Sequence, residues 1–215
     1  MWQDLQDCLF DAPFTVIAVA QEGRGAEQAR PWIEQARPGY PCLIDADHRV
    51  SALYGMVNVP QCVWIDERGL IVRPPETAGS TDHFRQMDFS TRTLAPELAA
   101  ARLAARAAYL DAVRAWVRTG KHALPADAAR ARLPAITAEM ARADALFRLG
   151  LHLRRVGQAG EAAECFAEAS RLHPESWCMF RDAQVLEPSG LAGGAAFWAR
   201  VNALGDKPYY KPPEL

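Results

Sequence analysis

Residues 54–73 read Tyr-Gly-Met-Val-Asn-Val-Pro-Gln-Cys-Val-Trp-Ile-Asp-Glu-Arg-Gly-Leu-Ile-Val-Arg, and this stretch decides the fold that the sequence predicts. Cys62–Ile65 is an apolar run, and Leu70–Val72 is a second one after a polar turn that contains Gly69. Two such runs joined by a short turn with glycine are typical of a β-hairpin. Because proline cannot donate to a sheet, we expect Pro60 just before the first strand.

Strand-like and helix-like runs alternate upstream of this hairpin. Phe14–Ala20 is almost entirely apolar, as expected of a strand that is covered on both faces. A helix is predicted over Ala26–Ala36, a short strand over Tyr40–Asp45 and a short helix over His48–Tyr54. This alternation predicts βαβ units and a largely parallel sheet that the antiparallel hairpin closes.

The sequence after the hairpin has a different character. Arg73-Pro74-Pro75 is expected to end the strand pattern, and the polar residues that follow indicate a linker. From Pro96 the composition changes to Ala, Arg and Leu, with a helix expected over Glu97–Arg118 that Gly120 ends. A second helix is expected within Ala126–Met140, where Pro134 kinks or restarts it. The predicted domains are residues 1–75, a linker at 76–96, and a helical domain at 97–215 with an extended C-terminal tail.

The hairpin region resembles a known family. Tyr54-Gly55, Val59-Pro60, Ile65-Asp66 and Gly69 occur in the order found in the back half of thioredoxin-like redoxins of the TlpA/ResA type. The resemblance covers about residues 1–75. It implies that the bond before Pro60 is cis and that its loop binds extended peptides by strand addition. The residues of this predicted peptide-binding loop are Asn58, Val59, Pro60 and Gln61.

The chain departs from that family at its beginning. In the family, the first core strand ends in a Cys-x-x-Cys motif at a helix N-terminus, which lowers the pKa of the first cysteine. Here Met1 falls where that helix is already under way, so the strand and both cysteines are missing. Either the Phe14–Ala20 and Cys62–Ile65 strands pair directly, or each presents an open edge that recruits another chain, and we expect a homodimer. Alternatively, the true start lies upstream of Met1.

A helical pair in the second half resembles one tetratricopeptide (TPR) repeat. Its predicted helices are Ala143–Val156 and Glu161–Leu172. The positions at that family's spacing are Leu146, Leu149, Gly150, Leu153, Ala162, Phe166, Ala169 and Pro174. The predicted fold is therefore an α/β thioredoxin-like sheet domain without its first core strand, followed by an all-α TPR-like domain.

Composition bounds the function classes. The chain has 215 residues, 50% of them hydrophobic, and a formal charge of −2, which gives no argument for nucleic acid. No apolar run approaches the roughly 18 residues of a membrane span. The acidic N-terminus lacks a signal peptide's pattern, which predicts a cytoplasmic protein, or an extracytoplasmic one if a leader has been lost. Five cysteines without Cys-x-x-Cys and five dispersed histidines predict neither a metal site nor a cofactor.

Two cysteines remain as candidate catalytic thiols. Cys62 lies two residues after Pro60, and Cys42 lies in its own predicted strand. A small buried core residue is the favoured interpretation of each, because cysteine is among the most buried residue types. The leading functional hypothesis is a protein-binding or assembly module for a protein or peptide partner. The alternative is a thiol–disulfide oxidoreductase or peroxidase-like enzyme that uses Cys62 or Cys42, or a truncated form whose Cys-x-x-Cys lies upstream.

Overall fold

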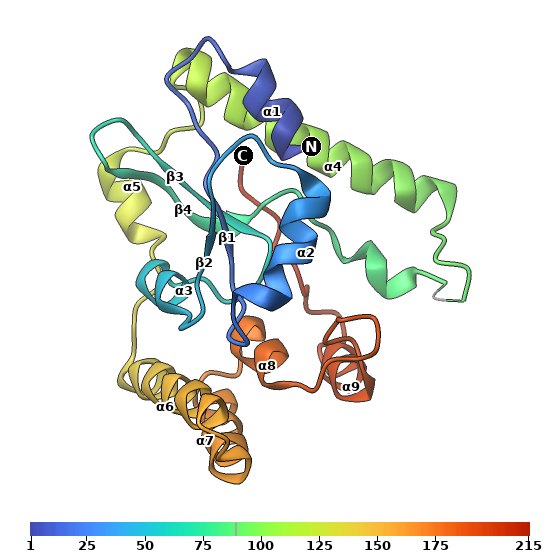
Figure 1. The fold of residues 1–215 in the computed structure, drawn as a ribbon. Coiled ribbons are helices and arrows are strands. Elements are labelled where there is room, and N and C mark those ends of the chain that lie inside the picture. The colour runs from blue at the N-terminus through green and yellow to red at the C-terminus, as the bar shows by residue number, and fades with distance from the viewer. Residues whose placement is uncertain (89) are drawn as a thin grey trace. The chain divides into compact units, whose positions relative to one another are not determined.

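The computed structural model describes residues 1–88 and 90–215 (Figure 1). The chain forms two compact units, and each is assembled from separate segments. Unit 1 comprises Met1–Gln6, Thr15–Val59 and Pro134–Arg200, whereas unit 2 comprises Asp7–Phe14, Pro60–Leu133 and Val201–Leu215. The predicted domain boundaries after residues 75 and 96 do not coincide with the limits of these units.

The described helices and strands are α1 (Trp2–Cys8), β1 (Ala18–Ala20), α2 (Ala26–Ala36), β2 (Cys42–Ile44), α3 (Arg49–Tyr54), β3 (Gln61–Ile65), β4 (Ile71–Thr77), the 3-10 helix η1 (Asp82–Gln86), α4 (Pro96–Thr119), α5 (Ala126–Ala131), α6 (Ala138–Arg155), α7 (Ala159–Leu172), α8 (Trp177–Ala183) and α9 (Ala195–Asn202).

Unit 1 contains a small parallel sheet. Strand β1 pairs with β2, with Ala18 opposite Cys42 and Ala20 opposite Ile44. The expectation that Phe14–Ala20 forms one covered strand is wrong, because β1 spans only Ala18–Ala20 and the Ile17 side chain before it is 57% exposed. Among the described residues β1 pairs with β2 alone, so direct pairing of β1 with β3 is not observed.

Unit 2 contains the predicted hairpin. Strands β3 and β4 are antiparallel, and Gln61 lies opposite Thr77. Pro60 precedes β3 as expected, and its carbonyl accepts a hydrogen bond from the Ala78 amide at 3.2 Å. The prediction that Pro74 and Pro75 end the strand is wrong, because β4 continues to Thr77. Prolines are tolerated there because, among residues 1–88 and 90–215, β4 pairs on one side only, with β3.

The helical predictions are confirmed at the level of single elements. Helix α4 ends where Gly120 adopts φ 74°, a left-handed conformation that glycine reaches without strain, and the Gly120 amide donates to the Trp116 carbonyl. The chain leaves the helical conformation between α5 and α6, around Pro134. Helix α6 then begins after Thr137, whose side chain accepts a hydrogen bond from the Met140 amide.

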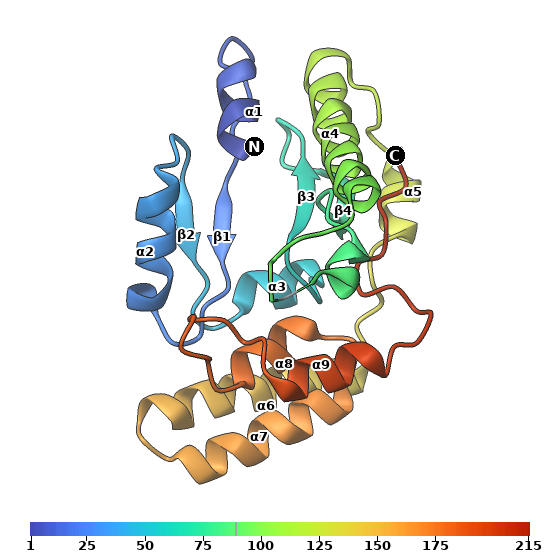
Figure 2. The same ribbon diagram turned by 90° about the vertical axis from the view of Figure 1, so that its right-hand side faces the viewer.

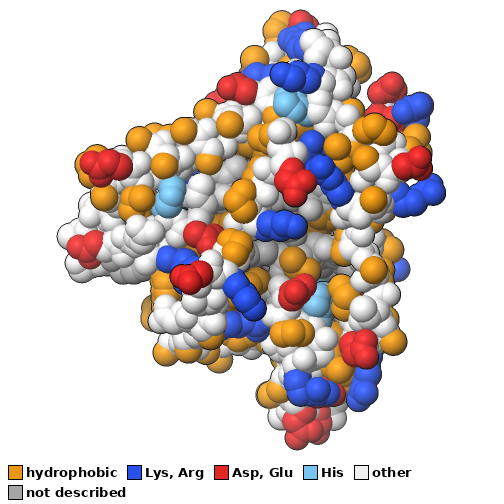
Figure 3. Space-filling model, turned by 180° about the vertical axis from the view of Figure 1, so that it is seen from behind, with side chains coloured by type: hydrophobic (Ala, Val, Ile, Leu, Met, Phe, Trp, Pro, Cys, Tyr) orange, Lys and Arg blue, Asp and Glu red, His pale blue; other side chains and the backbone are white. Residues whose placement is uncertain are grey.

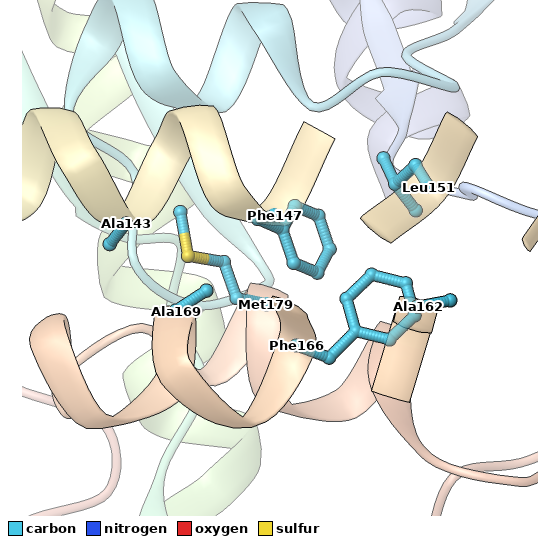
Figure 4. Packing of buried hydrophobic residues seen from close by; sticks show 7 residues of the cluster. All are labelled: Ala143, Phe147, Leu151, Ala162, Phe166, Ala169 and Met179. Carbon is cyan, nitrogen blue, oxygen red and sulfur yellow. The ribbon is translucent and has the colours of Figure 1, made fainter. Parts of the chain in front are cut away.

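Helices α6 and α7 form an antiparallel hairpin, and they lie side by side in Figures 1 and 2. Gly150 allows their close approach, because a Cβ there would lie 2.6 Å from the Phe166 ring. Figure 4 shows Phe147 of α6 and Phe166 of α7 facing each other, and their ring centroids are 5.3 Å apart. Met179 of α8 completes this core, so the hairpin does not bury its apolar face alone.

Candidate functional site

The structure separates the predicted thiol candidates. Cys42 lies in β2 of unit 1, whereas Cys62 lies in β3 of unit 2. Burial raises the pKa of the Cys62 thiol to about 12, although its hydrogen bond with Tyr109 acts in the opposite direction. A thiol with this pKa is protonated at neutral pH, whereas the nucleophile in thiol chemistry is the thiolate. This environment weighs against Cys62 as a catalytic nucleophile.

Cys62 is therefore expected to react slowly with a disulfide reagent at pH 7. Relative to an ordinary cysteine of pKa about 8.5, its thiolate fraction is lower by about a thousandfold or more. Stopped-flow titration should show a fast phase that Cys8→Ser removes, because Cys8 is exposed, and that Cys62→Ser leaves intact. Loss of the fast phase in Cys62→Ser would restore the enzyme hypothesis.

The predicted peptide-binding loop runs from unit 1 into unit 2. Asn58 is 5% exposed, and its side chain accepts a hydrogen bond from the Val59 amide at 2.9 Å. Just before it, the Val57 carbonyl accepts hydrogen bonds from the Trp177 and Cys178 amides at the beginning of α8. The chain entering the loop is thus held by the first turn of a helix. A peptide-binding role of Asn58–Gln61 stays a prediction.

A buried ionic cluster, which we call the Asp182 cluster, links the loops that follow β1 and β2 to helices α6 and α8 within unit 1. It consists of the Asp182 side chain and the four groups around it, from Gly23, Arg24, His48 and Arg154. His48 Nε2 and the Gly23 amide donate to Asp182 Oδ2 at 2.7 and 2.8 Å. Arg154 donates to Asp182 Oδ1 at 2.8 Å, and Arg24 lies 3.4 Å from that oxygen.

Charge compensation decides the ionisation of Asp182. Burial alone would raise the pKa of this carboxyl, but the hydrogen bond from His48 and the charge of Arg154 lower the pKa to about 2. Arg24 also donates to the Asp182 and Gln184 carbonyls at 2.7 and 2.5 Å. Asp182 is therefore a permanent anion at neutral pH, and it fixes both arginines in position.

These two arginines are among the residues that line a surface groove beside α7 and α8, which we call the α7–α8 groove. Its volume is about 860 Å³. The lining residues are Arg24, Arg154, Ala159, Ala162, Ala163, Phe166, Ala167, Ser170, Arg171, Phe180, Ala183, Gln184, Val185 and Leu186. All of them belong to unit 1. Val185 at its rim is 92% exposed, so apolar surface in the groove meets solvent.

Small residues shape the wall that α7 contributes. Ala159, Ala163 and Ala167 recur every four residues along α7, and all three are exposed. Phe166 forms part of the groove's floor, with the Arg154 guanidinium 5.3 Å from its ring centroid. Because the distance between packed helices depends on the side chains at the contact, an alanine ridge admits a close neighbour. The lining of this groove therefore combines apolar side chains with guanidinium groups.

Sequence reasoning missed the polar part of this site. No pattern in residues 21–25 distinguishes Arg24 from an ordinary solvated arginine. Asp182 lies 134 residues from His48 along the chain, and no local spacing links the two. The apolar face of α7, by contrast, follows from helical periodicity in the sequence.

His173, at the end of α7, adds a pH-dependent element to unit 1. Burial lowers the pKa of His173, although the charge of Asp144 acts against this. At His173 the unfolded chain therefore binds more protons than the folded chain around pH 6.5, and the contribution of this group to the free energy of unfolding should fall as the pH falls from 7.5 to 5.5. In urea unfolding, His173→Gln should flatten this dependence, and His152→Gln at an exposed position should not. Equal slopes in wild type and His173→Gln would contradict the prediction.

Among residues 1–88 and 90–215, no group of three or more His, Cys, Asp or Glu side chains is placed to hold a metal ion. No helix in this part of the chain is both long enough and apolar enough to cross a membrane. On the face seen in Figure 3, Lys and Arg side chains are interspersed with Asp and Glu and do not gather into a basic track.

Comparison with known proteins identifies no relative of this chain. No family model, curated protein or solved structure was found to match the chain.

Proposed function

We propose that this chain is a protein-binding module that takes an amphipathic helix of a partner protein into the α7–α8 groove. The observation that carries the proposal is an open apolar groove of about 860 Å³ with arginines along it and no carboxylate among its lining residues. Helix-in-groove recognition needs such an apolar surface, with polar groups at its margin to fix the orientation of the ligand.

The form of the groove favours a helical ligand. One face of α7 packs on α6, and Ala162, Phe166 and Ala169 are buried there. The ridge of Ala159, Ala163 and Ala167 lies on an uncovered part of the same helix. A partner helix placed along this ridge would extend the helical hairpin by one more layer, with its apolar side chains on Phe180 and Leu186.

The charges at the groove favour an acidic ligand. Arg24, Arg154 and Arg171 line the groove, whereas the carboxylates that pair with them, Glu22, Asp182 and Glu168, do not. The cationic side of each pair thus faces the groove. Guanidinium groups bind carboxylates by paired, charge-assisted hydrogen bonds. A partner helix with Asp or Glu beside its apolar face fits this arrangement.

Catalysis by a thiol is the less favoured function. The Cys62 thiol is held in its protonated form, as is the Cys178 thiol, whose pKa burial raises to about 12. The parallel β1–β2 pair, the hairpin after Pro60 and the α6–α7 pair support the proposal that the chain is a redoxin-like protein joined to a TPR-like repeat. In this proposal the Asn58–Gln61 loop is a second contact surface.

The proposal includes self-association. Among the described residues β1 pairs with β2 alone. Ile17, just before β1, and Leu43, within β2, are 57% and 53% exposed. An unpaired edge with apolar neighbours is a template for another chain. Light scattering is expected to give about 47 kDa, twice the 23.7 kDa of one chain, and Ile17→Lys is expected to halve it. A wild-type mass of one chain would contradict the proposed dimer, but it would not bear on ligand binding in the α7–α8 groove.

A selection experiment tests the groove. A displayed library of random 15-residue peptides should yield binders that combine an apolar helical stripe with acidic residues. Ala163→Trp fills the groove and should weaken their binding by at least about tenfold, which corresponds to 1.4 kcal/mol. The matched control is Ala101→Trp, at an exposed position of α4 in unit 2, and it should leave binding unchanged. Binders that tolerate Ala163→Trp would place the binding surface elsewhere.

A further inference from the structure

A second concave site lies between α3 and α6, within unit 1, and we call it the α3–α6 cleft. Its volume is about 430 Å³, within the range of small-molecule sites. The lining residues are Asp47, Arg49, Ala145, Arg148, Leu149, His152 and Arg155. None of them lines the α7–α8 groove. The cleft and the groove are therefore two separate sites of unit 1.

Positive charge is concentrated in this cleft. Arg148, His152 and Arg155 recur at intervals of four and three residues, so they share one face of α6, and Arg49 supplies a guanidinium from α3. Asp47 is the only carboxylate in the lining, and it is paired with Arg155. Three guanidinium groups thus face one carboxylate, in a chain whose formal net charge is −2.

Among the described residues, two of the three arginines in the cleft form no ion pair within 4.0 Å. Arg148 donates from Nε to the Asp144 carbonyl, a neutral acceptor, at 3.4 Å. Burial raises the pKa of the Asp144 carboxyl, and the charge of Arg148 acts against this increase. No ion pair within 4.0 Å is formed by the Arg49 side chain in the described part of the chain. An anion that enters the cleft would meet Arg49 and Arg148 from two different helices.

The wall that carries Arg49 is held in place by buried groups. The Asp45 carboxylate accepts hydrogen bonds from the Arg49 and Val50 amides at 2.8 and 2.7 Å, which fixes the first turn of α3. The preceding residue, His48, is hydrogen-bonded to the buried Asp182. The backbone of the cleft is therefore set before a ligand arrives, and preorganisation of this kind lowers the cost of binding.

We propose that the α3–α6 cleft binds a small, free anion that carries one or more phosphate groups. Arginine's planar fork matches phosphate oxygens in a bidentate manner, and His152 supplies a further donor. The lining contains no aromatic ring other than His152, so a nucleobase would find little to stack on, and the recognition centres on phosphate. Leu149 and Ala145 give the cleft a small apolar floor for the carbon frame of such a metabolite.

Calorimetry with inorganic pyrophosphate tests the proposal on the full chain. At a fixed ionic strength of 0.15 M, wild type should bind pyrophosphate with a submillimolar dissociation constant. Arg49→Gln and Arg148→Gln should each weaken binding by about tenfold or more, the effect expected from losing a charge-assisted contact. The matched control is Arg142→Gln, which removes an exposed arginine from the same helix outside the cleft. Its dissociation constant should stay within about twofold of wild type.

A second readout does not depend on the variants. Amide resonances of Arg49 and Leu149 in wild type should move on addition of pyrophosphate and should move less with an equal ionic strength of chloride. Absence of pyrophosphate binding, or equal weakening by Arg142→Gln and Arg148→Gln, would overturn the site. A phosphoserine peptide that binds about tenfold more tightly than pyrophosphate would overturn the assignment to a free anion. Neither result bears on the α7–α8 groove.

Discussion

Asp182→Ala is expected to lower the free energy of unfolding by about 3–5 kcal/mol, the cost of removing one partner from a buried ionic contact. The substitution leaves the buried His48 ring without its hydrogen-bond acceptor. It also removes the carboxylate that pairs with the Arg154 guanidinium, which is 25% exposed and keeps its hydrogen bond to the Asp182 carbonyl. It also removes the acceptor of the Gly23 amide. Urea unfolding followed by circular dichroism measures the effect.

The matched control is Asp111→Ala in α4. Asp111 pairs with Arg114 at 2.6 Å, but its side chain is 71% exposed, and exposed pairs contribute about 0.2–1 kcal/mol. A change below about 1 kcal/mol for Asp182→Ala, similar to this control, would show that the Asp182 cluster does not hold unit 1 together.

The same carboxylate predicts a pH dependence. Because the pKa of Asp182 is about 2 in the folded chain, below the unfolded value of about 3.9, its contribution is complete above about pH 4. The contribution is lost as the pH falls from about 4 to about 2. Asp182→Ala should therefore be less sensitive to acid than wild type in this interval.

Gly150→Leu is expected to destabilise the chain by about 2–3 kcal/mol, although leucine is the better helix former by nearly 1 kcal/mol. A Cβ at position 150 would lie 2.6 Å from Cε1 of Phe166, so α6 and α7 must move apart or the ring must leave its place. Thermal unfolding of the variant measures the loss.

Gly160→Leu is the control for this substitution. Gly160 lies in α7, and a Cβ there would meet nothing within 4 Å. Stability should be unchanged or should rise by up to about 1 kcal/mol, because only helix propensity acts. A change of the same sign and size in both variants would contradict close packing of α6 on α7 at Gly150.

Local patterns were sufficient to predict most single elements. Turn chemistry and hydrophobic periodicity predict the hairpin after Pro60 and the end of α4 at Gly120. They also predict α6 and α7, the two helices joined near residues 157–160. Strand β4 was predicted too short, because prolines exclude a central strand but not one that pairs on one side. The strand predicted over Phe14–Ala20 was too long, since an apolar run does not show whether neighbouring elements exist to cover it.

The candidate sites depended on contacts that no local pattern records. Arg24 and Asp182 meet across 158 residues of sequence, as shown by the hydrogen bond from Arg24 to the Asp182 carbonyl. Arg49 and Arg148 likewise line one cleft only because the fold brings α3 and α6 together there. The spacing of Arg148, His152 and Arg155 was visible as a helical face, but a solvated arginine face has the same spacing. Only the tertiary fold distinguishes these cases.

Methyl NMR tests the central claim, that the α7–α8 groove binds an acidic amphipathic helix, most directly. Alanine methyl groups are labelled, and two 15-residue helical peptides with the same leucine stripe are compared, one with glutamate and one with lysine on its flanks. The account predicts that the glutamate peptide shifts the methyl resonances of Ala163 and Ala167, leaves that of Ala101 in place, and binds at least about tenfold more tightly than the lysine peptide. Unmoved Ala163 and Ala167 resonances, or equal binding of the two peptides, would contradict it.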